Sequence, residues 1–424
     1  MTFKDRFCSS PWFHMRINNS GHYEYCRWAT KQDRNNLPDI QEQTPLHFFQ
    51  QGMSSIRQSL LNGELLDTCR ECHQMEARGK VSGRQRQLLK TGIRLDDFTN
   101  TMLSSPWLEE FKKTETTLTP QDWQIDLGNF CNSACIFCEP NSSSRLANEF
   151  KRIGIINEVP QASWCENPIK FNFFLDSLRE SKTTKYLHFI GGETLITPAF
   201  KRILETLVEE NLHKKITVGF TTNLTVWDQT VVDLLTQFEQ VNLGLSVECI
   251  HPLNDYVRYG SNIDQTLEIM EQWLDVAKNS NWLVQLRTTP TIFTMWHLAT
   301  VYEYAYQRNI SVESCNFLND PAFMRPSVLP MSVRSQVIAR LSDWINRYEH
   351  TPTEQIINTR HPAFAQQQII QDACSYVDYL QNQPDESERL PDLVNYIKLL
   401  ESSRNNSILR YLPEYEELLR SAGY

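Results

Sequence analysis

A loop with three closely spaced cysteines, placed directly after a strand-like run, constrains this chain more than any other feature. The run Trp123–Leu127 ends in a Gly-Asn pair, and Cys131, Cys135 and Cys138 follow, so that one short loop can wrap a compact metal centre. Thiolates are the natural ligands of iron–sulfur clusters. Three thiolates on a four-iron cube leave one iron open for a substrate or cofactor, as a catalytic zinc keeps one free position.

The loop resembles the signature of the radical S-adenosylmethionine (SAM) enzymes. That signature is Cys-x3-Cys-x2-Cys with an aromatic residue, here Phe137, just before the last cysteine. The resemblance implies a catalytic 4Fe-4S cluster whose open iron binds the amino and carboxylate groups of SAM. One electron then cleaves SAM to a 5'-deoxyadenosyl radical. The cofactor carries this chemistry, and the protein holds, orients and shields it.

Zinc is the alternative metal for these three cysteines. Zinc sites favour paired Cys-x2-Cys arms and four closed ligands, whereas the loop offers three cysteines. The sequence therefore favours a cluster over zinc or over three incidental cysteines.

Composition indicates a soluble, globular protein of the cytoplasm. The 424 residues are 40% hydrophobic and 22% charged, and no apolar run approaches the length of a membrane span. The first residues lack the apolar segment of a signal peptide. In a reducing compartment, free thiols are read as metal ligands rather than disulfides. The net charge of -10 argues against a nucleic-acid partner, because duplex binding needs clustered positive charge.

Residues 1–95 are predicted to form a small module that a bound metal holds together. A β-hairpin between Phe7 and Cys26, with Gly21 in its turn, could bring Cys8 and Cys26 together. Cys69 and Cys72 add a Cys-x2-Cys pair, and four thiolates are enough to close a metal site. Such a metal would stabilise a segment too small to build a strong core.

This module resembles the auxiliary-cluster module of the twitch/SPASM-like radical SAM proteins. The resemblance implies a second, auxiliary 4Fe-4S cluster, fully ligated by Cys8, Cys26, Cys69 and Cys72. In many relatives the module follows the radical SAM core, whereas here it precedes the core. Structural zinc stays open at this position, since four thiolates also suit zinc.

Residues 96–121 are predicted to be a linker with a helical turn near Leu108–Lys112, and residues 122–320 alternate strand and helix. The predicted strands are Trp123–Leu127, Tyr186–Ile190, Ile216–Thr221, Gln240–Val247, Trp282–Thr288 and Val312–Leu318. This α/β alternation predicts a parallel sheet with helices on its outer face. The resemblance makes the sheet a partial (β/α)6 barrel, with active residues at the carboxyl ends of the strands.

Polar motifs follow several of these strands. Gly191, Gly192 and Glu193 come after the second strand and resemble the Gly-Gly-Glu motif that binds the SAM amino group, and the two glycines let the backbone approach a ligand closely. Asn223 follows the third strand, where relatives often carry an Asn near the cofactor, and a polar turn is the alternative.

The later strands supply four further candidates for cofactor binding. The resemblance implies that Ser246, and after it Glu248, contact the SAM ribose or carboxylate. Arg258 could reach a carboxylate or cap a helix. Arg287 lies within the fifth strand, where a charge must face the barrel mouth or pair inside it, and we expect it to contact SAM or a substrate carboxylate. Cys315 could donate a hydrogen atom to a product radical, although packing is its simpler role.

Residues 321–424 are predicted to be helical and could cover the open side of the barrel, which would keep a carbon radical from solvent. The predicted helices are Val333–Tyr348, Ile369–Gln381, Pro391–Leu400 and Ile408–Ser421.

The sequence thus predicts a radical SAM enzyme that takes a hydrogen atom from its substrate. A peptide or protein side chain is the first choice of substrate, and a small metabolite or nucleoside is the alternative. An electron donor such as flavodoxin or ferredoxin is the expected partner. The rival hypothesis is a non-catalytic zinc or iron–sulfur binding protein, which leaves the loop 131–138 and Gly191–Glu193 as coincidence.

Overall fold

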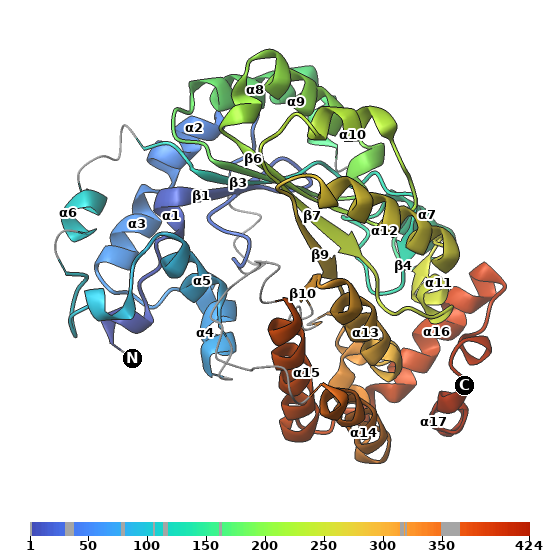
Figure 1. The fold of residues 1–424 in the computed structure, drawn as a ribbon. Helices are drawn as coiled ribbons and strands as arrows, with labels where there is room; N and C mark the ends of the chain where they lie inside the picture. Colours follow the sequence, from blue (N-terminus) through green and yellow to red (C-terminus); the bar gives the residue numbers. More distant parts are fainter. Residues whose placement is uncertain are drawn as a thin grey trace. The chain divides into compact units, whose positions relative to one another are not determined.

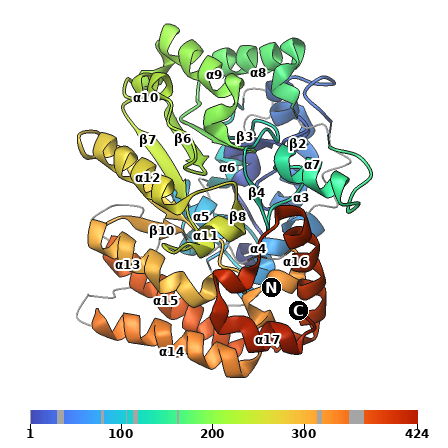
Figure 2. The same cartoon turned by 90° about the vertical axis from the view of Figure 1, so that its right-hand side faces the viewer.

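A computed structural model describes residues 2–29, 38–77, 81–104, 107–112, 118–160, 163–313, 318, 320–348 and 365–424 (Figure 1, Figure 2). The chain divides into two compact units. Unit 1 is Met1–Phe130, Gln161–Gly219 and Gln237–Glu239; unit 2 is Cys131–Pro160, Phe220–Thr236 and Gln240–Tyr424. Within the described ranges, no helix has the length and apolar character needed to cross a membrane.

The described strands that lie wholly in unit 1 are β1 (His14–Ile17), β2 (Tyr23–Glu24), β3 (Asp122–Asp126) and β5 (Tyr186–Ile190). β1 and β2 pair antiparallel, which confirms the predicted hairpin. β1 also pairs in parallel with β3, and β3 pairs in parallel with β5. The amino-terminal strands β1 and β2 therefore belong to the same sheet as β3, the strand that precedes the cysteine loop.

The two faces of these strands differ in polarity because side chains alternate along a strand. On one face, Trp123 packs edge-on against Phe174 of α8 (Pro168–Glu180), and Phe189 packs against Phe200 of α9 (Pro198–Glu209). The opposite face carries polar residues of β3 and β5, among them Gln124, Asp126 and His188. The apolar face thus packs against the helices, and the opposite face carries polar side chains that are nevertheless buried.

The described amino-terminal helices of unit 1 are α1 (Ser10–Phe13), α2 (Pro45–His47), α3 (Ser54–Leu61), α4 (Arg70–Ala77), α5 (Gly83–Lys90) and α6 (Trp107–Lys112). α6 confirms the predicted helical turn in the linker. The segment before Ile17 was expected to be extended, but α1 forms a helical turn there. Pro11 lies in its first turn, where a missing N–H costs no helical hydrogen bond.

Unit 2 repeats the strand–helix alternation. β7 (Val241–Ser246), β9 (Leu283–Arg287) and β10 (Ser311–Glu313) pair in parallel in that order, and β6 (Thr217–Thr222) crosses the boundary between the units. The helices between or beside these strands are α7 (Ser144–Arg152), α10 (Gln229–Leu235), α11 (Leu253–Val257), α12 (Ile263–Lys278) and α13 (Leu298–Arg308). The chain is therefore an α/β protein in which parallel pairing dominates, as predicted. β10 ends at Glu313, and Cys315 lies outside the described residues.

The carboxyl-terminal part of unit 2 is helical, with α14 (Met331–Arg347), α15 (Ala365–Asn382), α16 (Leu390–Arg404) and α17 (Glu416–Ser421). The helix expected from Ile408 onward is broken into short pieces. Pro413, which cannot donate a backbone hydrogen bond, starts one of them. α15 packs beside β10, where the Gln368 amide donates to the Val312 carbonyl at 3.4 Å.

Candidate active site

The cysteine loop of unit 2 is held by a two-stranded ladder. Ala134 and Cys135 form β4, which pairs antiparallel with Arg258 and Tyr259 of β8. The Ile136 amide donates to the Val257 carbonyl at 2.9 Å, so the ladder continues past Cys135. The loop that the sequence singled out thus has a fixed backbone rather than an extended, open one.

The three cysteines of the loop lie close together. Cys135 is buried, and Cys131 and Cys138 are half-buried. Burial raises the pKa of the Cys138 thiol, and the neighbouring sulfurs of Cys135 and Cys131 raise this pKa further. The Ser133 amide points at the Cys131 sulfur at 3.5 Å, a donor suited to a thiolate ligand. By their chemistry, three thiolates suit an iron–sulfur cluster. Within the described residues, however, no group of three or more His, Cys, Asp or Glu side chains is arranged to hold a metal ion, so the cluster is assigned from the donor chemistry and not from the side-chain geometry.

Asn223, predicted near the cofactor, is tied to this loop. Its amide nitrogen lies 2.9 Å from Asn132 Oδ1 and 3.0 Å from Ser133 Oγ. Its amide oxygen accepts from the Thr225 backbone N–H at 3.1 Å, and Asn132 in turn donates to Thr225 Oγ1 at 2.8 Å. The turn after β6 therefore fastens the segment between the first two cysteines.

The Gly-Gly-Glu motif of unit 1 packs against the backbone that leads into the cysteine loop. Gly191 and Gly192 have φ angles of +92° and +55°, which glycine adopts without the clash of a side chain. A Cβ at Gly192 would stand 2.2 Å from the Phe130 carbonyl oxygen. The Glu193 amide donates to that same oxygen at 2.8 Å, and the buried Glu193 carboxylate accepts from the Leu195 amide at 3.1 Å. Only glycine fits this close backbone approach.

Glu248 and Arg258 form a buried pair rather than two separate contacts. Arg258 donates to Glu248 Oε1 at 2.7 Å, and the other carboxylate oxygen accepts from Thr288 Oγ1 at 3.1 Å and from the Thr289 amide at 2.7 Å. Burial raises the pKa of Glu248, and the Arg258 guanidinium opposes this rise. Arg258 is paired across the ladder with Cys135, so the pair fixes a cation beside the cysteine loop.

Ser246 and Arg287 lie opposite each other at the carboxyl ends of β7 and β9, and Glu313 lies opposite Arg287 on β10. Arg287 Nε is 3.4 Å from Glu313 Oε2. A Cβ at Gly244 would stand 2.5 Å from Arg287 Nε and 3.0 Å from Thr221 Oγ1, so the guanidinium lies over the glycine of β7. The strand ends of unit 2 thus present a row of polar and charged groups on one face.

The four amino-terminal cysteines of unit 1 gather at one place. Burial raises the pKa of the Cys8 thiol, and the sulfurs of Cys69, Cys26 and Cys72 raise it further. The Ser10 amide donates to the Cys8 sulfur at 3.4 Å. Burial also raises the pKa of Cys72, which amides at the start of α5 lower in part. Cys8 is thus within electrostatic reach of the other three thiols, and four thiolates by their chemistry suit a closed metal site.

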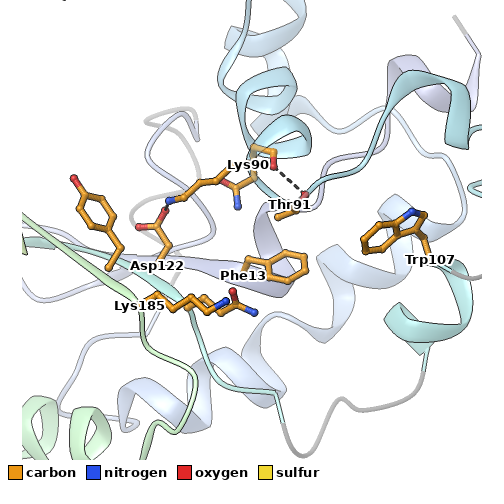
Figure 3. A pocket seen from close by; sticks show the side chains of 9 residues that line it. Phe13, Lys90, Thr91, Trp107, Asp122 and Lys185 are labelled. Carbon is orange, nitrogen blue, oxygen red and sulfur yellow. Dashed lines mark hydrogen bonds and ion pairs between the residues drawn. The ribbon is translucent and has the colours of Figure 1, made fainter. Parts of the chain in front are cut away.

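A separate pocket of about 540 Å³ lies in unit 1 (Figure 3). It sits at the amino ends of β3 and β5, with Asp122 paired to Lys90 and with Lys185 close by. Phe13, Trp107 and Tyr186 supply its aromatic lining. Because Gly191–Glu193 follows the carboxyl end of β5, this pocket is at the opposite edge of the strands from the Gly-Gly-Glu motif.

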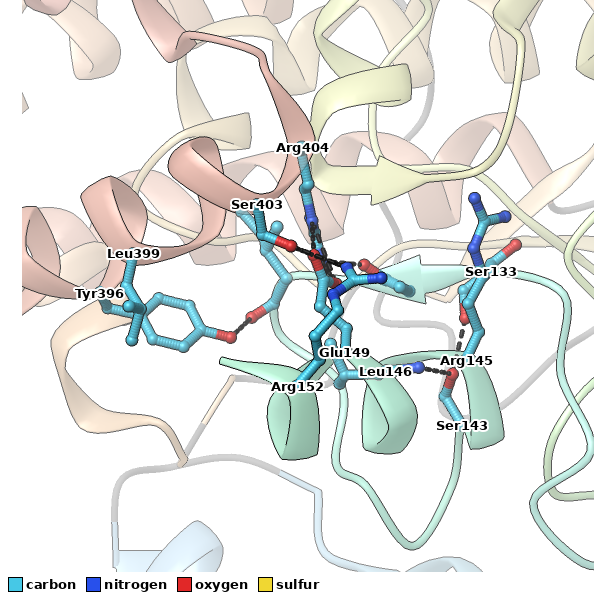
Figure 4. Close-up of polar contacts among 12 residues, drawn as sticks. Ser133, Ser143, Arg145, Leu146, Glu149, Arg152, Tyr396, Leu399, Ser403 and Arg404 are labelled. Atoms are coloured by element: carbon cyan, nitrogen blue, oxygen red, sulfur yellow. Dashed lines mark hydrogen bonds and ion pairs between the residues drawn. The ribbon is translucent and has the colours of Figure 1, made fainter. Parts of the chain in front are cut away.

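One set of contacts at the cysteine loop was not predicted from the sequence. Arg404 and Tyr396 of α16 donate hydrogen bonds to backbone carbonyls of the loop (Figure 4). They are separated from the loop by more than two hundred residues and belong to no motif, so no local signal could have found them.

One comparison with known protein families bears on the core of the chain. The sequence profile of the radical SAM superfamily matches residues 125–284. No curated protein sequence matches the chain. Among solved structures, SuiB of Streptococcus suis bound to SAM is 15% identical with a TM-score of 0.35, over 66% of this chain and 59% of SuiB.

Two further solved structures show a similar level of resemblance. A structure of anSMEcpe with bound AdoMet and a peptide is 16% identical with a TM-score of 0.35, over 54% of this chain and 60% of that one. The methyltransferase TsrM of Kitasatospora setae, with tryptophan substrate and a SAM analogue, is 14% identical with a TM-score of 0.33, over 51% of this chain and 38% of TsrM. The chain spans less than two thirds of the length of each of these three proteins. The profile match shows that residues 125–284 are similar to the radical SAM superfamily, and this similarity indicates an enzyme.

Proposed function

We propose that Cys131, Cys135 and Cys138 hold the catalytic 4Fe-4S cluster and that SAM binds beside Gly191–Glu193. The observation that carries this proposal is the loop itself, in which three mutually close thiols sit on a backbone fixed by the β4–β8 ladder. The bound cluster would supply the electron that cleaves SAM to a 5'-deoxyadenosyl radical. A flavodoxin or ferredoxin is the proposed donor of that electron.

The chain's own residues would bind and orient the reactants. The close approach of Gly192 to the Phe130 carbonyl fixes the backbone of the Gly-Gly-Glu motif, which would hold the SAM amino group. Asn223 fixes the loop segment 132–133. Burial raises the pKa of the Cys135 thiol, and the positive charge of Arg258 beside it opposes this rise. We propose that the strands complete a partial (β/α)6 barrel around this site.

We also propose that Cys8, Cys26, Cys69 and Cys72 hold an auxiliary 4Fe-4S cluster. The convergence of the four sulfurs in unit 1 and the amide donors at Cys8 and Cys72 support this assignment. Four thiolates leave no ligand position open, so the cluster would carry electrons or brace the module rather than bind SAM. A structural zinc is the alternative that metal analysis would reveal.

The proposed substrate is a peptide or protein side chain. Ser246, Arg287 and Glu313 form a row at the strand ends, so the face offers a cation, an anion and a hydroxyl side by side. Such a row can bind the paired donors and acceptors of a peptide, since guanidinium groups bind carboxylates and carbonyls well. The 5'-deoxyadenosyl radical would then take a hydrogen atom from a carbon of that substrate.

Metal and SAM chemistry test the catalytic assignment. The protein purified without oxygen should contain about eight irons per chain if both clusters are four-iron, and dithionite should release 5'-deoxyadenosine. Cys135→Ala should lose about half of the iron and all of this product. Cys72→Ala should lose the other half. A colourless protein that contains zinc and does not cleave SAM would end the proposal.

Deuterium transfer tests the substrate class. Extract from cells grown in deuterated medium is separated into peptide and small-molecule fractions, and each is incubated with the reduced enzyme and unlabelled SAM. Deuterium should appear in 5'-deoxyadenosine with the peptide fraction, and protease treatment of that fraction should abolish the transfer. Deuterium transfer from the small-molecule fraction alone would replace the peptide by a metabolite.

A further inference from the structure

Arg404, at the end of α16, is buried against the cysteine loop within unit 2. Its guanidinium donates to the Ala134 carbonyl at 2.9 Å, directly before Cys135 in the sequence. It also forms a two-pronged contact with Glu149 of α7, through Nε at 3.0 Å and Nη2 at 2.7 Å. The Arg404 and Glu149 side chains are only 4% and 5% exposed. Figure 4 shows the two side chains facing each other beside β4.

Tyr396, two turns earlier on α16, contacts the other side of the same cysteine. Its hydroxyl donates to the Ile136 carbonyl at 2.8 Å, directly after Cys135. Its ring packs edge-on against Phe150 of α7, with centroids 6.2 Å apart. The carbonyls on both sides of Cys135 are therefore held by side chains of one helix.

The ring of Tyr259 joins this arrangement to the β8 strand. The Arg404 guanidinium lies over that ring, 4.4 Å from its centroid, and the Arg145 guanidinium lies 5.2 Å from it. Arg145 also donates to the Asn132 carbonyl. Side chains of α16, α7 and β8 thus all contact the loop or one another, and the Arg404–Glu149 pair is a second buried ion pair beside the loop, in addition to Glu248–Arg258.

We propose that α16 is a positioning element for the catalytic cluster: Tyr396 and Arg404 fix the backbone of Cys135, and the Arg404–Glu149 pair sets the electrostatic potential at the cluster. This inference rests on the proposed function, because it assigns the cluster to the same loop. A cation next to a cluster favours the reduced state, which carries one more negative charge, and a buried carboxylate disfavours it. The two members of the pair therefore act on the reduction midpoint with opposite signs.

Two charge variants test the electrostatic part. Arg404→Gln leaves the Glu149 carboxylate uncompensated by its buried partner, so the midpoint should shift to a more negative potential. Glu149→Gln leaves the Arg404 cation, so the midpoint should shift to a more positive potential. The measurement is a dithionite titration followed by EPR, in which the catalytic cluster is the one whose signal changes when SAM is added.

Tyr396→Phe tests the backbone contact without a change of charge. The ring packing stays, so the protein should fold, and its midpoint should equal that of the wild type. Its cluster should lose iron several-fold faster in the presence of a chelator, because the Ile136 carbonyl is no longer held. This variant keeps the proposal testable if Arg404→Gln fails to fold.

Arg389→Gln and Glu388→Gln are the matched controls, since both residues lie beside the first turn of α16 with exposed side chains. Neither control should change the midpoint or the iron loss. Midpoints that do not move, or that move in the same direction in both charge variants, would overturn the inference while wild-type SAM cleavage leaves the proposed function intact. A wild-type protein without a cluster would instead overturn the proposed function.

Discussion

At the scale of single residues, the site depends on contacts that leave no room for substitution. Gly192 meets the Phe130 carbonyl more closely than any Cβ allows, and it does so in the left-handed backbone region. The Phe130 carbonyl also accepts the Glu193 amide, so the two segments are joined where the motif meets the start of the cysteine loop. The Phe130 carbonyl oxygen thus excludes a side chain at Gly192 and also accepts the hydrogen bond from Glu193.

Gly192→Ala should lower SAM cleavage roughly 100-fold, because the motif backbone must shift by about an ångström to clear Phe130. Gly92→Ala is the matched control. Its φ of +75° carries a similar backbone penalty, but nothing lies within 4 Å of the added Cβ. The measurement is 5'-deoxyadenosine release at equal iron content. An equal loss in both variants would assign the effect to backbone strain instead of to the contact with Phe130.

The stacked pair His251 and His297 predicts a pH dependence of stability. Their ring centroids are 3.9 Å apart, and burial, followed by the neighbouring His251, lowers the pKa of His297 to about 4. The ordinary pKa of histidine is about 6.5, so between these values the unfolded state binds more protons than the folded state. The free energy of unfolding should therefore fall as the pH falls through this window, by on the order of 2 kcal/mol.

Thermal unfolding followed by circular dichroism at pH 7.5 and pH 5 checks this expectation. His297→Gln should flatten the dependence because the titrating group is removed. His47→Gln, at an exposed position, should leave the wild-type slope unchanged. A slope that survives the loss of His297 would show that other groups titrate in this range.

At the scale of elements, buried side chains hold the carboxyl-terminal helices together. Arg334 of α14 is fully buried and donates to the carbonyls of Gln383 and Pro384 at 2.8 Å and 2.7 Å. It also donates to the carbonyls of Ser327 and Leu329, which precede α14. The Arg334 guanidinium therefore satisfies backbone carbonyls in the segment before α14 and in the segment after α15.

Arg334→Met should lower the free energy of unfolding by about 3 kcal/mol or more, because it leaves several buried carbonyls without a donor. Arg347→Met, on the exposed end of the same helix, is the control and should change stability little. Thermal unfolding of the two variants checks the difference. Equal midpoints for both would show that water replaces the guanidinium.

At the scale of the whole molecule, the two sets of cysteines belong to different units. Cys8, Cys26, Cys69 and Cys72 lie in unit 1, and the loop 131–138 lies in unit 2. Metal binding couples to the folding of the segments that supply the ligands. Loss of either proposed metal should therefore destabilise its own unit first.

Hydrogen exchange of Cys72→Ala should show this separation. The segment 67–77, which carries two of the four ligands, should exchange many times faster than in the wild type, while peptides covering the loop 131–138 keep their protection. Cys135→Ala should give the reverse pattern and is the matched variant. Deprotection of both regions in both variants would show that the two metal sites fold as one cooperative unit.

Local sequence patterns were enough to predict the order of strands and helices and to single out the cysteine loop. Alternation of polar and apolar residues is a local property, so strands such as Tyr186–Ile190 were predicted with their observed bounds. The spacing of Cys131, Cys135 and Cys138 and the Gly-Gly pair are local as well, and both motifs stand at strand ends in the structure. The periodic pattern was misleading at Pro413, where the missing backbone N–H interrupts the helix that was predicted from Ile408 onward.

Only the tertiary structure decided which distant groups meet. It placed β1 beside β3, paired Glu248 with Arg258, and brought Arg404 and Tyr396 of α16 to the carbonyls around Cys135. The residues that make these contacts belong to no recognisable sequence motif. Which residues meet depends on how the apolar faces of the helices pack. A buried charge must find its partner wherever the fold supplies one, and that choice is made in three dimensions.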